Sequence, residues 1–127
     1  MKRVGRPPPF VEPQLAKLVT EPPRGKGWLF ETKFDGYRLE LASMGAQVRI
    51  YTRSGQDWTS HFPALARAAA AQRFDGVLID GEVVAMDAHG VSDFGLLQDA
   101  IERAPETLVF HAFDLLFDRG RDRRGVP

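Results

Sequence analysis

Apolar and polar positions alternate with a period of two in three stretches, at residues 29–35, 37–41 and 48–53. This period is typical of β-strands that are buried on one face. We therefore predict strand, tight bend and strand around Gly36, followed by a third strand. In the first stretch one face would carry three charged side chains about 6.6 Å apart at the usual rise, namely Glu31, Lys33 and Asp35.

Two segments have the sequence features of helices. Ser60 is a suitable N-cap, Pro63 suits the first turn, and alanine-rich sequence continues the helix to about residue 73. Ser92 is a suitable N-cap for the second helix, which Pro105 ends. Three apolar residues of that helix have the spacing of one face: Phe94, Leu97 and Ile101.

The remaining regular structure is β-rich. Residues 74–90 indicate either two strands or one bent strand, and residues 107–117 a buried strand. A short apolar element at residues 15–19 follows a Pro-rich arm or linker, residues 1–12. The predicted order β-β-β-α-β-β-α-β favours an α+β fold, a mostly antiparallel sheet flanked by helices, over a doubly wound parallel fold.

Composition narrows the class of protein. The chain has 127 residues, 43% of them hydrophobic, which is enough for one globular core. Seventeen basic residues balance seventeen acidic ones, so the overall charge does not point to nucleic acid as a partner. A local patch of basic residues is still compatible with this balance. Cysteine is absent and no stretch is long enough to cross a membrane, which favours a cytoplasmic protein with no membrane partner.

The charged cluster around Lys33 is the first candidate for chemistry. A free lysine, with a pKa of about 10.4, is a poor nucleophile until burial or a neighbouring cation such as Arg38 lowers that value. A solvated charged hairpin is the ordinary alternative. The string Lys-x-Asp-Gly-x-Arg, however, is expected by chance in only about two chains per thousand of this length.

That string is motif I of the covalent nucleotidyltransferases, the superfamily of ATP-dependent DNA ligases, RNA ligases and mRNA capping enzymes. Four blocks resemble, in order, the adenylation domain of bacterial ATP-dependent DNA ligases: GWLFETKFDGYRLEL, RIYTRSGQDWTSHFPAL, LIDGEVVAMDAHGVSDFGLLQ and VFHAFDLLF. Among these ligases, the sequence is most similar to the ligase module of the multifunctional non-homologous end-joining enzymes. The implied fold is the first half of the covalent nucleotidyltransferase, or ATP-grasp-like, fold.

The resemblance implies a role for each residue of motif I. Lys33 matches the nucleophile that attacks the α-phosphate of ATP and becomes lysyl-AMP. Glu31 and Thr32 match positions that contact the adenine edge. Asp35 matches a carboxylate near the metal ion, Mg²⁺ or Mn²⁺, and Arg38 a ribose contact. Phosphoryl transfer depends mainly on positioning and on cations, which agrees with these residue types.

Three residues outside motif I also match family positions. Arg53 matches an arginine that binds nucleotide and the 5′-phosphate of the nick, although most arginines are simply exposed. Glu82, in Asp-Gly-Glu, matches the glutamate that contacts the ribose or the metal shell. Phe113 matches an aromatic ring that stacks on adenine, where the ordinary alternative is a core phenylalanine. The three histidines, by contrast, lack metal-ligand spacing.

The implied activity is ATP-dependent DNA ligation in repair, on nicked or broken double-stranded DNA, with polymerases or end-binding repair proteins as candidate partners. The matching region would be a partial adenylation domain at residues 13–118, followed by a basic tail at residues 119–127. Family motifs IV and V and the OB-fold domain are absent from this sequence. We therefore expect impaired ligation by this chain alone. Two alternatives stay open: a non-catalytic nucleotide-binding remnant and, with less support, a capping-type guanylyltransferase.

Overall fold

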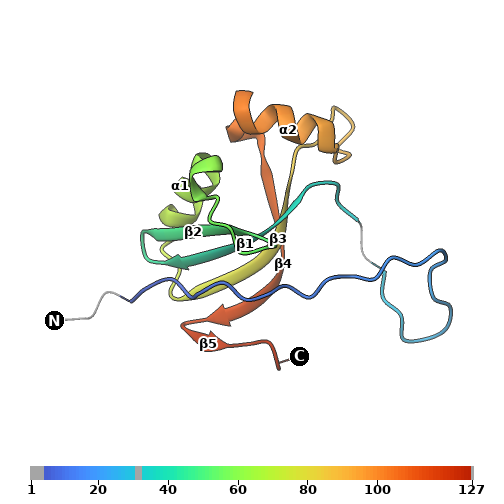
Figure 1. Ribbon diagram of the computed structural model, residues 1–127, viewed down its shortest axis with the longest axis horizontal. Coiled ribbons are helices and arrows are strands. Elements are labelled where there is room, and N and C mark those ends of the chain that lie inside the picture. The colour runs from blue at the N-terminus through green and yellow to red at the C-terminus, as the bar shows by residue number, and fades with distance from the viewer. Residues whose placement is uncertain (1–4, 31–32, 127) are drawn as a thin grey trace.

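A five-stranded antiparallel sheet with the strand order β2-β1-β3-β4-β5 forms the centre of the fold (Figure 1). The computed structural model describes residues 5–30 and 33–126. The strands are β1 (Tyr37–Met44), β2 (Gln47–Thr52), β3 (Val77–Val84), β4 (Val109–Asp118) and β5 (Arg121–Asp122). The α+β fold with an antiparallel sheet is therefore confirmed.

One face of the sheet carries the main core. Helices α1 (Pro63–Gln72) and α2 (Phe94–Arg103) lie on this face, together with the 3-10 turns η1 (Thr59–His61) and η2 (Pro105–Thr107) (Figure 1). The alternation along β1 turns Leu39 and Leu41 to this side, where they pack with Phe62 and Leu97. All four side chains are almost fully buried, so this face holds the sheet in place.

The opposite face carries charge and is covered by the N-terminal arm, residues 5–16, which runs beside the sheet (Figure 1). Arg38 and Glu40 of β1 lie opposite Glu82 and Asp80 of β3, so these four side chains share the face. Glu40 is buried under the arm, and its Oε1 accepts a hydrogen bond of 3.1 Å from the Val11 N–H. The arm therefore covers polar side chains as well as a small apolar cluster.

The strand predicted at residues 29–35 is wrong for the described residues. Residues 29–30 and 33–35 are outside any strand, and residues 31–32 lie outside the described part of the chain. Both edges of β1 are already occupied by β2 and β3, so the preceding segment has no strand to pair with. The apolar element expected at residues 15–19 likewise has no regular structure, and Leu15 is exposed.

Both predicted helix caps are also wrong. Ser60 lies inside η1, and the N-cap of α1 is Phe62, with Pro63 at the next position. Proline lacks an N–H, so this first turn has one donor fewer to satisfy. Helix α2 is capped by Asp93, whose side chain accepts from the Leu96 N–H at 2.9 Å.

The C-terminal strands bear out one of the two predicted alternatives and differ from the prediction in burial. Residues 74–90 contain the single strand β3, whose pairing with β4 has two irregularities, and the chain adds β5, so the order becomes β-β-α-β-α-β-β. Half of the residues of β4 are exposed and only Leu116 is buried, because Phe113 and Leu115 face no covering layer in the described part of the chain. The arginine-rich end forms β5, and Arg123 and Arg124 pair with Asp118 and Asp122.

The two α-helices are short. Each has ten residues, and among the described residues no helix has the length and apolar character needed to span a bilayer.

Candidate functional site

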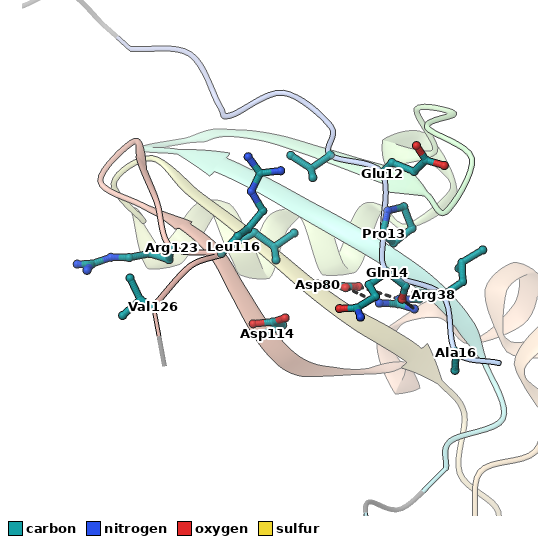
Figure 2. Close-up of a pocket in the computed structure, with 13 residues that line it drawn as sticks. Glu12, Pro13, Gln14, Ala16, Arg38, Asp80, Asp114, Leu116, Arg123 and Val126 are labelled. Atoms are coloured by element: carbon teal, nitrogen blue, oxygen red, sulfur yellow. Dashed lines mark hydrogen bonds and ion pairs between the residues drawn. The ribbon is translucent and has the colours of Figure 1, made fainter.

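Two open clefts share Arg38 as a lining residue. The first, here called the lysine cleft, has a volume of about 660 Å³ and is lined by Lys33, Arg38, Arg53, Glu82 and Trp58 among others. The second, here called the arm cleft, has a volume of about 580 Å³ and is lined by arm residues, Asp80, Asp114 and Arg123 (Figure 2). Because Arg38 lines both clefts, its contacts decide how each is shaped.

Lys33 lies in the irregular segment that leads into β1, of which residues 33–36 directly precede the strand, and its side chain is exposed. Gly36 ends the loop where the backbone passes very close to β3. A Cβ at this position would lie 2.0 Å from the Val83 carbonyl oxygen, so only glycine fits. The glycine of motif I is thus required by close packing, and it brings the lysine next to β3.

Arg38 is held by Asp80 in a two-pronged ion pair. The distances are 3.0 Å from Nε to Oδ1 and 2.6 Å from Nη2 to Oδ2, and Nη1 donates to the Gln14 carbonyl at 2.7 Å (Figure 2). The Asp80 hydrogen bonds raise the pKa of Arg38 above its ordinary value. The guanidinium also lies 5.5 Å from the centre of the Phe113 ring. Arg38 is therefore a fixed cation in the wall shared by the two clefts.

Glu82 and Asp35 bring two carboxylates close to Lys33. Burial raises the pKa of Glu82 above its ordinary value, while Arg38 lowers it, Asp35 raises it and Lys33 lowers it. No cluster of three or more His, Cys, Asp or Glu side chains suited to a metal ion occurs in residues 5–30 and 33–126. Mg²⁺ typically binds one or two carboxylates and completes its shell with substrate phosphates, so this donor pair fits such an ion.

Arg53 and Phe113 occupy exposed positions. Arg53 follows β2 directly and lines the lysine cleft beside Thr52 and Ser54. The Phe113 side chain on β4 is 49% exposed, so the alternative of an ordinary core phenylalanine does not hold. The ring therefore contacts the Arg38 guanidinium and keeps about half of its surface accessible.

The structure therefore brings most of the predicted site residues together. Four of them line one cleft: Lys33, Arg38, Arg53 and Glu82. Phe113 is joined to this group through Arg38, and Asp35 through its charge interaction with Glu82. Glu31 and Thr32 lie outside the described residues. Of the histidines, His61 and His89 are exposed and His111 is partly buried.

Sequence reasoning missed four residues near the site. Asp80 fixes Arg38, Trp58 lines the lysine cleft, and Ser92 and His111 contact the loop that carries Lys33. Asp80 had a usable signal, because it lies two residues before Glu82 and so shares its face of the strand. Ser92 and His111 had none, since their contacts join segments far apart in the sequence.

Comparison with known proteins identifies relatives for nearly the whole chain. The family profile described as ATP dependent DNA ligase domain matches residues 13–123. The multifunctional non-homologous end joining protein LigD of Pseudomonas aeruginosa is 42% identical over 120 residues, which cover 94% of this chain and 14% of that protein. The SPbeta prophage-derived DNA ligase-like protein LigB of Bacillus subtilis is 31% identical over 120 residues, which cover 93% of this chain and 43% of that protein.

Solved structures give the same result. A mycobacterial DNA ligase D complexed with ATP and MES has a TM-score of 0.64 and 39% identity, covering 72% of this chain and 30% of that chain. The ligase domain of Mycobacterium tuberculosis LigD has a TM-score of 0.65 at the same identity and coverage. The chain thus spans less than half the length of each of these relatives.

Proposed function

The chain belongs to the ATP-dependent DNA ligase domain family, and on that basis we propose that its lysine cleft carries out the first step of ligation, the transfer of AMP from ATP to Lys33. The observation that carries this proposal is the gathering of Lys33, Arg38, Arg53 and Glu82 in one cleft. A nucleophile, two cations and a carboxylate are the groups that nucleotidyl transfer to a lysine needs.

The proposed step forms one bond and breaks one. Neutral Lys33 Nζ attacks the α-phosphorus of ATP, a P–N bond forms, the bond to the β-phosphate oxygen breaks, and pyrophosphate leaves. The proton lost by Nζ passes to solvent, to which the side chain is exposed. Arg53 would bind phosphate oxygens, since its planar guanidinium can donate two hydrogen bonds at once.

The rest of the nucleotide would be placed by residues of the sheet. Glu82, on the face shared with Arg38, would accept hydrogen bonds from ribose hydroxyls. Phe113 offers a half-exposed ring on which adenine can stack. Asp35 and Glu82 would hold Mg²⁺ or Mn²⁺, which supplies positive charge to the phosphates when bound. Glu31 and Thr32 are proposed as adenine contacts from the family motif alone.

The later use of the AMP group is part of the same proposal. A lysyl-AMP bond stores the activation needed to cap a 5′-phosphate, after which a neighbouring 3′-hydroxyl displaces AMP. Nicked or broken double-stranded DNA is therefore the proposed substrate, in the cytoplasm, with polymerases or end-binding repair proteins as proposed partners. Relatives named as non-homologous end joining proteins support this substrate class.

Intact-mass spectrometry after incubation with ATP and Mg²⁺ or Mn²⁺ tests the first step. We expect an added mass of one AMP on the wild type and none on Lys33→Ala, while Lys26→Ala, which changes an exposed lysine outside the lysine cleft, keeps the adduct. An adduct that persists in Lys33→Ala would disprove the assignment. A folded wild type that binds ATP in calorimetry but forms no adduct would instead favour the non-catalytic nucleotide-binding reading.

A further inference from the structure

The loop that carries Lys33 has no helix or strand in its described residues 33–36 to hold it. A nucleophile must nevertheless be placed accurately, because a displacement of about 1 Å can cost about 100-fold in rate. An exposed lysine in an irregular segment therefore needs support from elsewhere in the fold.

Each of the three residues after Lys33 is attached to a different part of the fold. The Phe34 ring stacks on the His111 imidazole of β4, with ring centres 4.0 Å apart and planes 8° apart. The Asp35 N–H donates to Ser92 Oγ at 2.9 Å, although the two residues are 57 positions apart. Gly36 lies against the Val83 carbonyl of β3. Residues 34, 35 and 36 are thus each held by a contact with another segment.

Ser92 is available for this contact because another residue caps α2. It lies in the connection between β3 and α2, where it forms an isolated bridge with Met86, and the next residue, Asp93, is the cap. The Asp93 N–H donates to the Ala85 carbonyl at 3.0 Å, which closes the connection. The Ser92 hydroxyl is therefore held in place by backbone bonds and serves the Lys33 loop.

His111 contributes through its ring face rather than through a polar contact. It lies directly opposite Glu82 in the pairing of β3 with β4, so the stack is beside the proposed ribose and metal ligand. Its Nε2 is buried and has no hydrogen-bond partner in residues 5–30 and 33–126. A phenyl ring of similar shape would keep the stack and remove the unpartnered atom.

We propose that Ser92 and His111 are positioning residues that hold the Lys33 loop so that the Lys33 amine points into the lysine cleft. This inference rests on the proposed lysine adenylation. Neither side chain lines the cleft, so their loss should lower the rate of AMP transfer and leave the affinity for ATP nearly unchanged. Loss of a nucleotide-binding residue would instead change affinity.

The test is single-turnover AMP transfer at varied ATP concentration, measured on the full chain with radiolabelled ATP. We expect Ser92→Ala and His111→Ala to lower the maximal rate by about 10- to 100-fold, with the half-saturating ATP concentration within about twofold of wild type. His111→Phe and Ser92→Thr should restore most of the rate. Ser60→Ala, which removes an exposed hydroxyl in η1, is the matched control and should behave as wild type.

Hydrogen exchange provides a second measurement that does not depend on activity. The Asp35 amide should exchange faster in Ser92→Ala, while the amides of β3 and β4 keep their protection. Where an alanine variant does not fold, Phe34→Leu removes the stack from the loop side and should show the same loss of rate.

Three outcomes would overturn the inference: full rates in Ser92→Ala and His111→Ala, a loss that His111→Phe does not restore, or unchanged exchange at Asp35. A wild type that forms no adduct overturns the proposed function instead, so the two failures are distinguishable.

Discussion

Glu40 is a buried carboxylate, and we predict that it makes the protein less stable as the pH rises towards 7. Its side chain is 1% exposed, its Oε1 accepts from the Val11 N–H, and its Oε2 has no partner in the described residues. Burial raises its pKa from an ordinary 4.5 to about 7, the Val11 hydrogen bond and Arg38 lower it, and Asp80 raises it. The informative change is Glu40→Gln, which keeps the shape and removes the charge.

The size of the effect follows from the two pKa values. The folded protein holds the Glu40 proton more tightly than the unfolded chain does, so its contribution to stability is fully present below pH 4.5. It is lost as the pH rises through about 7. The interval between 4.5 and about 7, at about 1.4 kcal/mol per pH unit, corresponds to about 3 kcal/mol.

Urea unfolding followed by circular dichroism at pH 4.5 and pH 8 measures this difference. We expect wild type and Glu40→Gln to have similar free energies of unfolding at pH 4.5, and the variant to be more stable by about 3 kcal/mol at pH 8. If the arm separates first, the difference will be smaller and the protection of the Val11 amide, relative to its intrinsic exchange rate at each pH, will fall as the pH rises. Glu106→Gln, at an exposed position, is the control. Parallel pH profiles for wild type and Glu40→Gln would refute the reasoning.

Three further predictions concern the site. Asp80→Asn leaves the Arg38 charge half-buried without its partner, so urea unfolding should show a loss of about 3 kcal/mol; a loss below about 1 kcal/mol would contradict the importance of this ion pair. Gly36→Ala forces a Cβ against the Val83 carbonyl, so thermal unfolding should show strong destabilisation and mass spectrometry no adduct, whereas Gly125→Ala, in open space, should match wild type. Phe113→Ala should weaken ATP binding in calorimetry by about 1–3 kcal/mol, with little change in unfolding temperature because the ring is exposed; unchanged affinity would exclude the proposed stacking.

Sequence patterns predicted the fold correctly where the local alternation of apolar and polar residues is enough to determine which side chains are buried. The alternation along β1 and β2 placed their apolar residues correctly, because one face of the sheet packs on the helices. The same rule failed at residues 29–35, where the pattern is present but no neighbouring strand is available. It also overstated the burial of β4, because an apolar run is buried only where something covers it. Whether a strand has a neighbour to pair with, and whether another layer covers it, depends on the whole fold.

The residues of the candidate site also fall into two groups, those that a local pattern could predict and those that depend on contacts between distant segments. Lys33, Arg38, Arg53 and Glu82 were predicted from short strings that resemble a family's motifs, and the structure places them in one cleft. Ser92 was assigned to a helix cap, and the local rule could not show that Asp93 would take that place and leave the hydroxyl for Asp35. His111 carried no recognisable pattern, because its contribution is a stacked ring face from another strand.

The charged groups of the lysine cleft and the main core lie on different faces of the sheet. Leu41 and its neighbours pack under the helices, while Arg38 and Glu82 lie on the opposite face. The cleft touches the core where Leu39 and Trp58 line it. Exposed members of the cleft, such as Lys33 and Arg53, contribute little packing, so removing them should cost little stability. Arg38 is the exception, because its ion pair with Asp80 connects the cleft to the buried part of that face. A substitution at Arg38 should therefore change folding and the proposed nucleotide binding together, and only its exposed neighbours can report on the proposed chemistry alone.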